Sequence, residues 1–165
     1  MAANEFVGTW VLAGHKSINE ELDISHESQA FETEMAEWLY GNSDDAVSGL
    51  EPVSGLRLSV AGNGTFTELK TSLPEIDWFD AEGVLDDEVN PFSGIYNVSD
   101  SRAYLTFKDP PEWSRSEDKA RIRYDDGDTK ICDSLFVKDD GLVRTISVVS
   151  DDLYLNRVIL RYERG

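Results

Sequence analysis

The chain has 165 residues, 40% hydrophobic and 10% aromatic, with 33 acidic against 15 basic side chains and a formal net charge of −18. This length and composition fit a single folded domain over residues 1–165 with an apolar core, and they argue against disorder. The strong negative charge argues against nucleic acid and anionic membrane surfaces as partners, because both would be repelled.

Short strand-like segments dominate the chain, beginning with residues 6–13 (FVGTWVLA). Residues 56–61 and 65–70 flank Gly62-Asn63-Gly64, a hairpin signal because asparagine and glycine tolerate the positive φ of tight turns. Further strands are predicted at 93–98, 102–108, 119–125, 129–138, 141–149 and 153–163. No helical pattern lies between the later segments, so we expect an antiparallel, meandering sheet of eight or nine strands.

One helix is predicted between the first strand and the first hairpin. In the segment ESQAFETEMAEWLYG, the side chains of Phe31, Met35, Trp38 and Leu39 recur at helical spacing and form one apolar stripe. The glutamates mostly occupy the other faces. The pattern therefore predicts an amphipathic helix over residues 28–40 that covers an apolar surface.

Few residues carry recognisable chemistry. Cys132 is the only cysteine, so no internal disulfide is expected. His15 and His26 match no metal-ligand spacing, and no phosphate-binding glycine loop or nucleophile motif occurs, so we expect neither a metal nor a cofactor. No signal-peptide pattern is present, and no apolar run approaches the roughly 20 residues of a membrane-spanning helix. We therefore expect a cytoplasmic protein without membrane insertion.

The two ends of the chain resemble the calycin superfamily, which includes the lipocalins and the intracellular fatty-acid-binding proteins. FVGTW is similar to the opening strand of fatty-acid-binding proteins, and YLNRVILRYER is similar to their closing strand. The chain also resembles small bacterial calycin-like barrels of natural-product biosynthesis. The resemblance implies a mainly β fold, an up-and-down antiparallel barrel of 8–10 strands. Its short helical insertion after the first strand (28–40) would be a lid, and residues 71–92 would be a long rim-covering loop.

The resemblance also assigns residues to the closure of the barrel. Trp10 matches the family tryptophan that plugs the closed end of the barrel. Gly8 lies two residues before Trp10 on the same strand. Arg157 or Arg161 would supply the basic group that packs across this tryptophan. These residues are expected to have a structural role.

Parity along the last strand assigns candidate ligand-binding residues, because successive side chains point to opposite faces. The uncharged face is the better barrel interior, and it presents Tyr154, Asn156, Val158, Leu160 and Tyr162. Aligned on the family's ending, Leu160 takes the place of a ligand-carboxylate arginine. This departure argues against a carboxylate clamp of the fatty-acid type.

Other candidates lie on neighbouring segments. The stretch GLVRTI is similar to a family stretch with an inward arginine, which makes Arg144 a candidate anchor. An inward Asp133 would need a partner, because a buried lone carboxylate is costly, and Arg144 is the obvious choice. The pair is either an exposed cross-strand pair or a buried polar anchor. Met35 and Trp38 either pack within the lid or contact the ligand.

Two functional hypotheses follow. The first is a non-enzymatic protein that sequesters a hydrophobic small molecule, such as a fatty acid, polyene or polyketide-like compound, in the barrel cavity. The alternative is a cofactor-free enzyme, for example a cyclase or isomerase, that acts on a natural-product intermediate in the same cavity. A protein–protein module using the acidic surface is a third reading. The sequence leaves monomer and homodimer open.

Overall fold

The computed structural model describes residues 5–21, 36–40, 49–70, 92–99, 101–106, 119–125, 129–150 and 154–165. One antiparallel sheet contains all ten strands of this part of the chain. The strands are β1 (Gly8–Glu21), β2 (Glu51–Pro52), β3 (Leu56–Val60), β4 (Thr65–Lys70), β5 (Phe92–Ser99), β6 (Arg102–Thr106), β7 (Ile122–Asp125), β8 (Thr129–Lys138), β9 (Gly141–Ser150) and β10 (Tyr154–Arg164).

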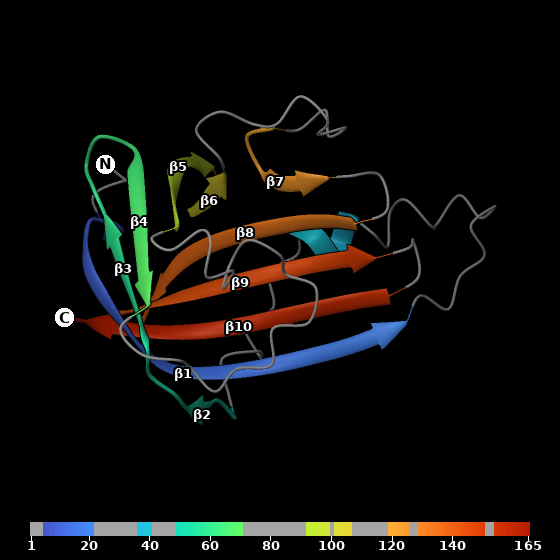
Figure 1. The fold of residues 1–165 in the computed structure, drawn as a ribbon, viewed down its shortest axis with the longest axis horizontal. Coiled ribbons are helices and arrows are strands. Elements are labelled where there is room, and N and C mark those ends of the chain that lie inside the picture. The colour runs from blue at the N-terminus through green and yellow to red at the C-terminus, as the bar shows by residue number, and fades with distance from the viewer. Residues whose placement is uncertain are drawn as a thin grey trace.

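The sheet closes on itself. Its order is β10-β9-β8-β6-β5-β4-β3-β1, and β1 pairs back onto β10, so eight strands complete the ring (Figure 1). β2 adds to β1, and β7 pairs with β8 off this ring. The predicted antiparallel up-and-down barrel is confirmed, and it is the architecture that the resemblance to calycins implies.

The first and last strands form the seam of the barrel. They pair antiparallel from Trp10 opposite Arg164 to Glu21 opposite Tyr154. β1 extends beyond the predicted segment 6–13. Its largely polar residues 14–21 remain in the strand because they pair with β10. The register shifts between Leu12 and Gly14, a β-bulge that changes which side chains of β1 face inward.

The strand predicted at 119–125 was expected to lie between its chain neighbours in the sheet, but β7 lies off the path of the ring. It begins at Ile122, and within the described residues it pairs with β8. β6 pairs directly with β8 instead, through Ala103 opposite Leu135 and Tyr104 opposite Ser134. β6 and β7 thus pair with successive parts of β8, β6 at residues 134 and 135 and β7 at residues 130–132.

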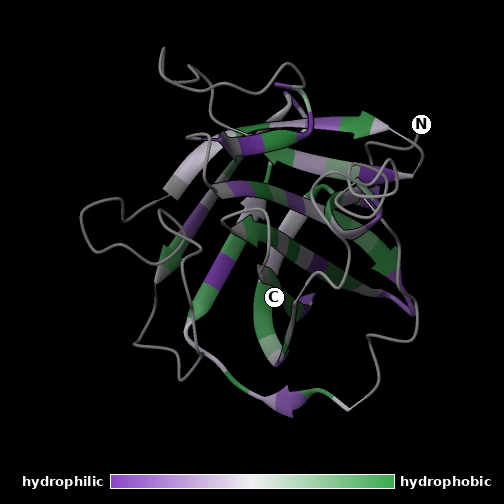
Figure 2. Cartoon of the chain, turned by 90° about the vertical axis from the view of Figure 1, so that its right-hand side faces the viewer, coloured by the Kyte–Doolittle hydropathy of each residue, from purple (hydrophilic) through white to green (hydrophobic). Residues whose placement is uncertain are grey.

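Apolar side chains from every strand of the ring meet in one buried cluster, which defines the barrel interior. Representatives from the eight strands are Trp10, Leu58, Phe66, Tyr96, Leu105, Ile131, Ile146 and Leu160. Figure 2 shows the alternation of hydrophobic and hydrophilic residues along the strands that places these side chains on one face. The interior is therefore lined largely by aliphatic and aromatic groups.

The described part of the predicted helix, residues 36–40, packs on the outside of the barrel. Leu39 belongs to a separate buried cluster with Cys132, Val149 and Leu155. These are the outward residues of β8, β9 and β10, because their chain neighbours face the interior cluster. In Figure 1 the helical turn lies behind β8 and β9. This turn covers the outer wall. Residues 28–35, including Met35, and the loop 71–91 lie outside the described residues, so the lid expected over 28–40 stays a prediction.

Candidate functional site

An ion pair lies on the inner wall of the barrel. Arg144 of β9 donates to Asp133 of β8 twice, from Nε to Oδ1 at 2.8 Å and from Nη2 to Oδ2 at 2.6 Å. Both side chains are fully buried. Of the two alternatives left open by the sequence, the pair is therefore the buried one, and its role as a ligand anchor stays a prediction. This bidentate geometry is the strong form of the arginine–carboxylate interaction.

Residues from distant strands complete the site. Arg144 Nη1 donates to Glu68 Oε2 of β4 and, at 3.3 Å, to the hydroxyl of Tyr162 on β10. The Tyr162 hydroxyl donates to the same Glu68 oxygen at 3.1 Å. Arg123 of β7 donates from Nη1 to Asp133 Oδ2 at 2.9 Å. We call Arg144, Asp133, Glu68, Tyr162 and Arg123 the inner cluster.

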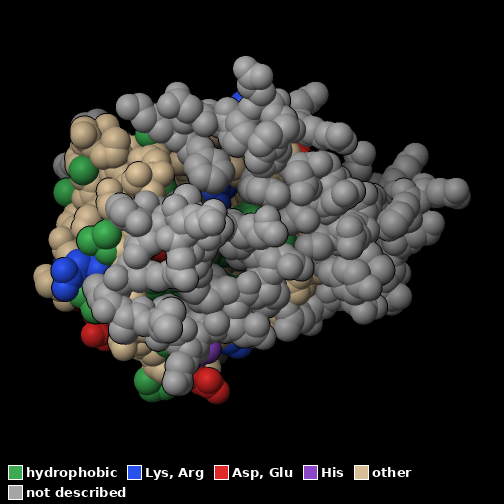
Figure 3. Space-filling view, viewed as in Figure 1, with side chains coloured by type: hydrophobic (Ala, Val, Ile, Leu, Met, Phe, Trp, Pro, Cys, Tyr) green, Lys and Arg blue, Asp and Glu red, His purple; other side chains and the backbone are tan. Residues whose placement is uncertain are grey.

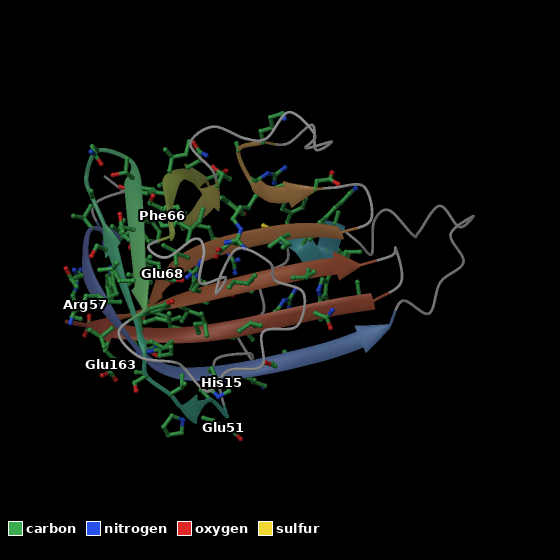
Figure 4. The ribbon with its side chains drawn as sticks, viewed as in Figure 1. His15, Glu51, Arg57, Phe66, Glu68 and Glu163 are labelled. Atoms are coloured by element: carbon green, nitrogen blue, oxygen red, sulfur yellow. The ribbon has the colours of Figure 1, made fainter. Side chains whose placement is uncertain are left out.

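The topology explains how the inner cluster forms. β4 and β9 are several strands apart in the ring, so Glu68 can reach Arg144 only across the interior; Figure 4 shows Glu68 on β4 beside the ribbon of β9. Arg123 occupies the register shift between Ile122 and Tyr124, where β7 departs from regular pairing with β8. Such a bulge re-aims a side chain, here onto Asp133. The cluster thus joins one wall of the barrel to the opposite wall.

Burial controls the electrostatics of the inner cluster. It raises the pKa of Glu68 above its usual 4.5, against the opposing effect of Arg144. Burial also raises the pKa of Tyr162 well above 10.0, with the carboxyl of Glu68 adding to the effect. The second carboxyl oxygen of Glu68, Oε1, is buried and has no hydrogen-bond partner among the described residues. A buried polar atom without a partner is uncommon and calls for an explanation, such as a bound group.

Replacing Glu68 is expected to change how stability depends on pH. Because the folded-state pKa of Glu68 is raised, its protonation stabilises the fold below about pH 4.5, and this contribution is lost as the pH rises through the folded-state pKa. Glu68→Gln removes the titration, so the variant should gain stability relative to the parent protein as the pH rises above about 4.5, the usual pKa of the group. Urea unfolding over this range measures the difference, with exposed Glu163→Gln as control. Parallel curves for the Glu68 variant and the parent protein would contradict the assignment.

A second polar site lies on β1, beyond its bulge. The shift after Leu12 places His15 opposite Leu160 and Ser17 opposite Val158, both inward residues of β10. His15 and Ser17 therefore take the inward positions. His15 Nδ1 and Ser17 Oγ are buried without hydrogen-bond partners in the described part of the chain.

A pocket opens beside these two side chains. It has a volume of about 310 Å³ and is lined by His15, Lys16, Ser17, Gly49 and Glu51. His15 Nε2 lies 3.9 Å from Glu51 Oε2, whose side chain is 80% exposed. Figure 4 shows His15 and Glu51 together where β2 meets β1, and in Figure 3 a histidine lies beside charged groups at the lower edge. The pocket is thus accessible from the surface and falls in the size range of small-molecule sites.

Most of the candidates on the last strand face the interior. Val158, Leu160 and Tyr162 are fully buried in the interior cluster, and Tyr162 also belongs to the inner cluster. Asn156 follows the same parity and is half-buried. The side chain of Tyr154 lies outside the described residues.

Trp38 takes a different place from the one expected for a ligand contact. Its Nε1 donates to the backbone carbonyl of Asn156 at 3.0 Å. The guanidinium of Arg157 lies 4.2 Å from its ring centre and donates to its backbone carbonyl at 2.5 Å. Both residues are on the outer wall, so Trp38 and Arg157 attach the helical turn to the barrel.

The basic group stacked on Trp10 comes from the end of the chain. Arg164 lies 4.2 Å from the ring centre and donates to the carbonyl of Val7 at 2.8 Å. It takes the place that the sequence assigned to Arg157 or Arg161; Arg161 instead donates to the carbonyl of Asp139. Gly8 has a φ of +143°, and a Cβ there would overlap the Arg164 guanidinium. Gly8 therefore makes room for the cation that covers Trp10.

Several residues of the site were not identified from sequence. Glu68 had the parity of Phe66 on a clear strand, so the inward position of a carboxylate could have been noticed. Arg123 carried no signal, because its orientation depends on a bulge. His15 and Ser17 were not identified because the strand was expected to end at residue 13. Their inward orientation also depends on a bulge, the one after Leu12.

Within the described residues, no group of three or more histidine, cysteine, aspartate or glutamate side chains is arranged to hold a metal ion. In the same part of the chain, no helix has the length and apolar character needed to cross a membrane.

No protein-family model and no curated protein matches the chain. Solved structures with a similar course include zebrafish ileal bile acid-binding protein complexed with cholic acid, at 11% identity and a TM-score of 0.40, over 98% of this chain and 99% of that one. The fluorescent protein UnaG matches at 15% identity and a TM-score of 0.39, over 99% of both chains. A protein of unknown function from the DUF3598 family of Nostoc punctiforme matches at 10% identity and a TM-score of 0.38, over 99% of this chain and 49% of its own.

Proposed function

We propose that this chain is a non-enzymatic binding protein that holds a small, largely apolar molecule in its barrel, in the cytoplasm. The observation that carries the proposal is the inner cluster, whose charged groups are buried in an otherwise apolar interior with Glu68 Oε1 left without a partner. Apolar residues of similar volume usually give equal or greater stability than buried ion pairs. A polar cluster at this position therefore supports a role in recognition rather than in stability alone.

The surrounding wall supplies the apolar contribution to binding. Val158 and Leu160 of β10 and Ile146 of β9 are fully buried and lie beside the inner cluster in the strand register. Burial of apolar ligand surface contributes about 25 cal/mol per Å², several kcal/mol for a small molecule before ordering costs. The ligand classes suggested by the sequence, a fatty acid, a polyene or a polyketide-like compound, all have such an apolar body.

The neutral dye Nile red tests the proposal. We expect Nile red to bind the protein. We expect Val158→Thr to weaken binding by roughly fivefold, because a hydroxyl group in the apolar inner wall makes the binding free energy of an apolar dye less favourable by about 1 kcal/mol. Val11→Thr makes the same change at a side chain that is 37% exposed and should leave the affinity unchanged. Fluorescence titration measures both constants. The absence of dye binding, or equal effects of the two substitutions, would contradict binding in the interior.

The enzymatic alternative has one specific observation in its favour. Glu68, with its raised pKa, accepts a hydrogen bond from Tyr162 in a buried site, and such a pair can move a proton. A cyclase or isomerase acting on a natural-product intermediate would use it in this way. Conversion of a bound polyene that is slowed by Tyr162→Phe, with Nile red affinity unchanged, would favour the enzyme over the binding protein.

A further inference from the structure

The arginine at the centre of the inner cluster is already engaged. Arginine has five N–H donors, and four hydrogen bonds from Arg144 go to Asp133, Glu68 and Tyr162. A ligand carboxylate would have to displace one of these groups to form a bidentate pair with Arg144. The inner cluster thus differs from a site that offers a free cation to an anionic ligand.

The charges of the inner cluster are balanced as well. Two arginines, Arg144 and Arg123, face two acids. Asp133 contacts both arginines, and Glu68 contacts Arg144. An added carboxylate would be a third buried acid beside these two, and burying an unpaired charge is costly. The net charge of −18 opposes anionic ligands from a distance.

Three buried atoms that can accept a hydrogen bond, on Glu68, His15 and Ser17, have no partner among the described residues, and they fit a hydrogen-bond donor on the ligand. Glu68 Oε1 is a carboxyl oxygen with no partner in the interior. On β1, His15 turns Nε2 toward Glu51, and with the proton on that nitrogen Nδ1 accepts hydrogen bonds. Ser17 Oγ, also without a partner among the described residues, can accept or donate. Hydroxyl and N–H groups complement these atoms, whereas a carboxylate offers them no donor.

From these observations we infer that the barrel selects an uncharged apolar molecule bearing a hydroxyl or N–H group, and discriminates against carboxylates. The donor group of the ligand is bound by Glu68 Oε1 in the interior or by His15 and Ser17 at the pocket. This inference rests on the proposed binding function and narrows its ligand class. Among the classes suggested by the sequence, it disfavours an ionised fatty acid.

A matched pair of probes tests the inference. Dodecan-1-ol and dodecanoate, which differ in the head group, are competed against Nile red at neutral pH. We expect the alcohol to bind at least about tenfold more tightly than the carboxylate. Glu68→Gln removes one buried negative charge and should narrow this ratio by strengthening dodecanoate binding. Glu163→Gln removes the same charge from an exposed position on β10 and should leave the ratio unchanged.

The outcomes separate the inference from the function on which it rests. Binding of dodecanoate as tightly as dodecan-1-ol, with Nile red bound, would overturn the inference and leave the binding function standing. A preference for dodecan-1-ol over dodecanoate that is unchanged in Glu68→Gln but lost in His15→Ala or Ser17→Ala would support the inference. This result would place the site that binds the ligand's donor group at the pocket. A ratio insensitive to all three variants would overturn it. Failure of Nile red and both probes to bind would overturn the binding function itself.

Discussion

Asp133→Asn is expected to destabilise the protein by about 3–5 kcal/mol, the usual cost of removing one partner from a buried ion pair. Asp133 accepts hydrogen bonds from both Arg144 and Arg123, and all three side chains are buried. The asparagine side chain keeps the shape of the aspartate but leaves two arginines close together with Glu68 as the remaining acid of the inner cluster. Urea unfolding followed by tryptophan fluorescence measures the loss.

The control for this prediction makes the same change at the surface. Asp140 is exposed in the turn after β8, with a φ of +61° that asparagine also adopts readily. Asp140→Asn should change the unfolding free energy by less than about 0.5 kcal/mol. If Asp133→Asn were equally mild, the ion pair could not be fully desolvated, and the balance of charges argued for the interior would be wrong.

Gly94→Ala is expected to be the most disruptive single-methyl change in the described part of the barrel. A Cβ at this position of β5 would overlap the backbone carbonyl oxygen of Thr106 on β6 and lie 3.1 Å from the ring of Phe66. A backbone atom cannot move aside without loss of the β5–β6 pairing, in which Ile95 lies opposite Thr106. We expect a loss of about 3 kcal/mol or more in the free energy of unfolding, at the upper end of overpacking effects.

Gly62 provides the matched control for this change. A Cβ on Gly62 would meet nothing within 4 Å, and its φ lies outside the left-handed region. Gly62→Ala should therefore alter the unfolding free energy by less than about 0.5 kcal/mol. Similar losses in the two variants would show that β5 and β6 approach less closely than the barrel geometry requires.

Strand positions were the most predictable feature of this chain. The alternation of apolar and polar residues located the strands from residue 56 onward to within a few residues, because a side chain's face is fixed by its place along an extended strand. The Asp133–Arg144 pair was also predictable, since an inward carboxylate needs a partner and the neighbouring strand offered one. The parity of Val158, Leu160 and Tyr162 identified the inward face of β10 for the same reason.

Features that depend on register irregularities were not predictable. The bulge after Leu12 turns His15 and Ser17 inward, and the bulge in β7 turns Arg123 onto Asp133. A bulge adds one residue to one strand, so it reverses the parity of everything beyond it on that strand. Its position depends on the partner strand as well as on the local sequence, which explains why these residues were missed.

By itself, the sequence determined that this is a β-rich domain with an apolar interior, and the similarity of its two end segments to known opening and closing strands indicated a closed barrel. Local alternation and turn residues are enough for the first conclusion, because both act over a few neighbouring residues. Tertiary structure alone decided that Glu68 crosses the interior to Arg144, that Arg164 covers Trp10, and that residues 36–40 pack on the outer wall. Each of these contacts joins residues far apart in the chain, so its geometry depends on how the barrel closes and on the register of every strand between them.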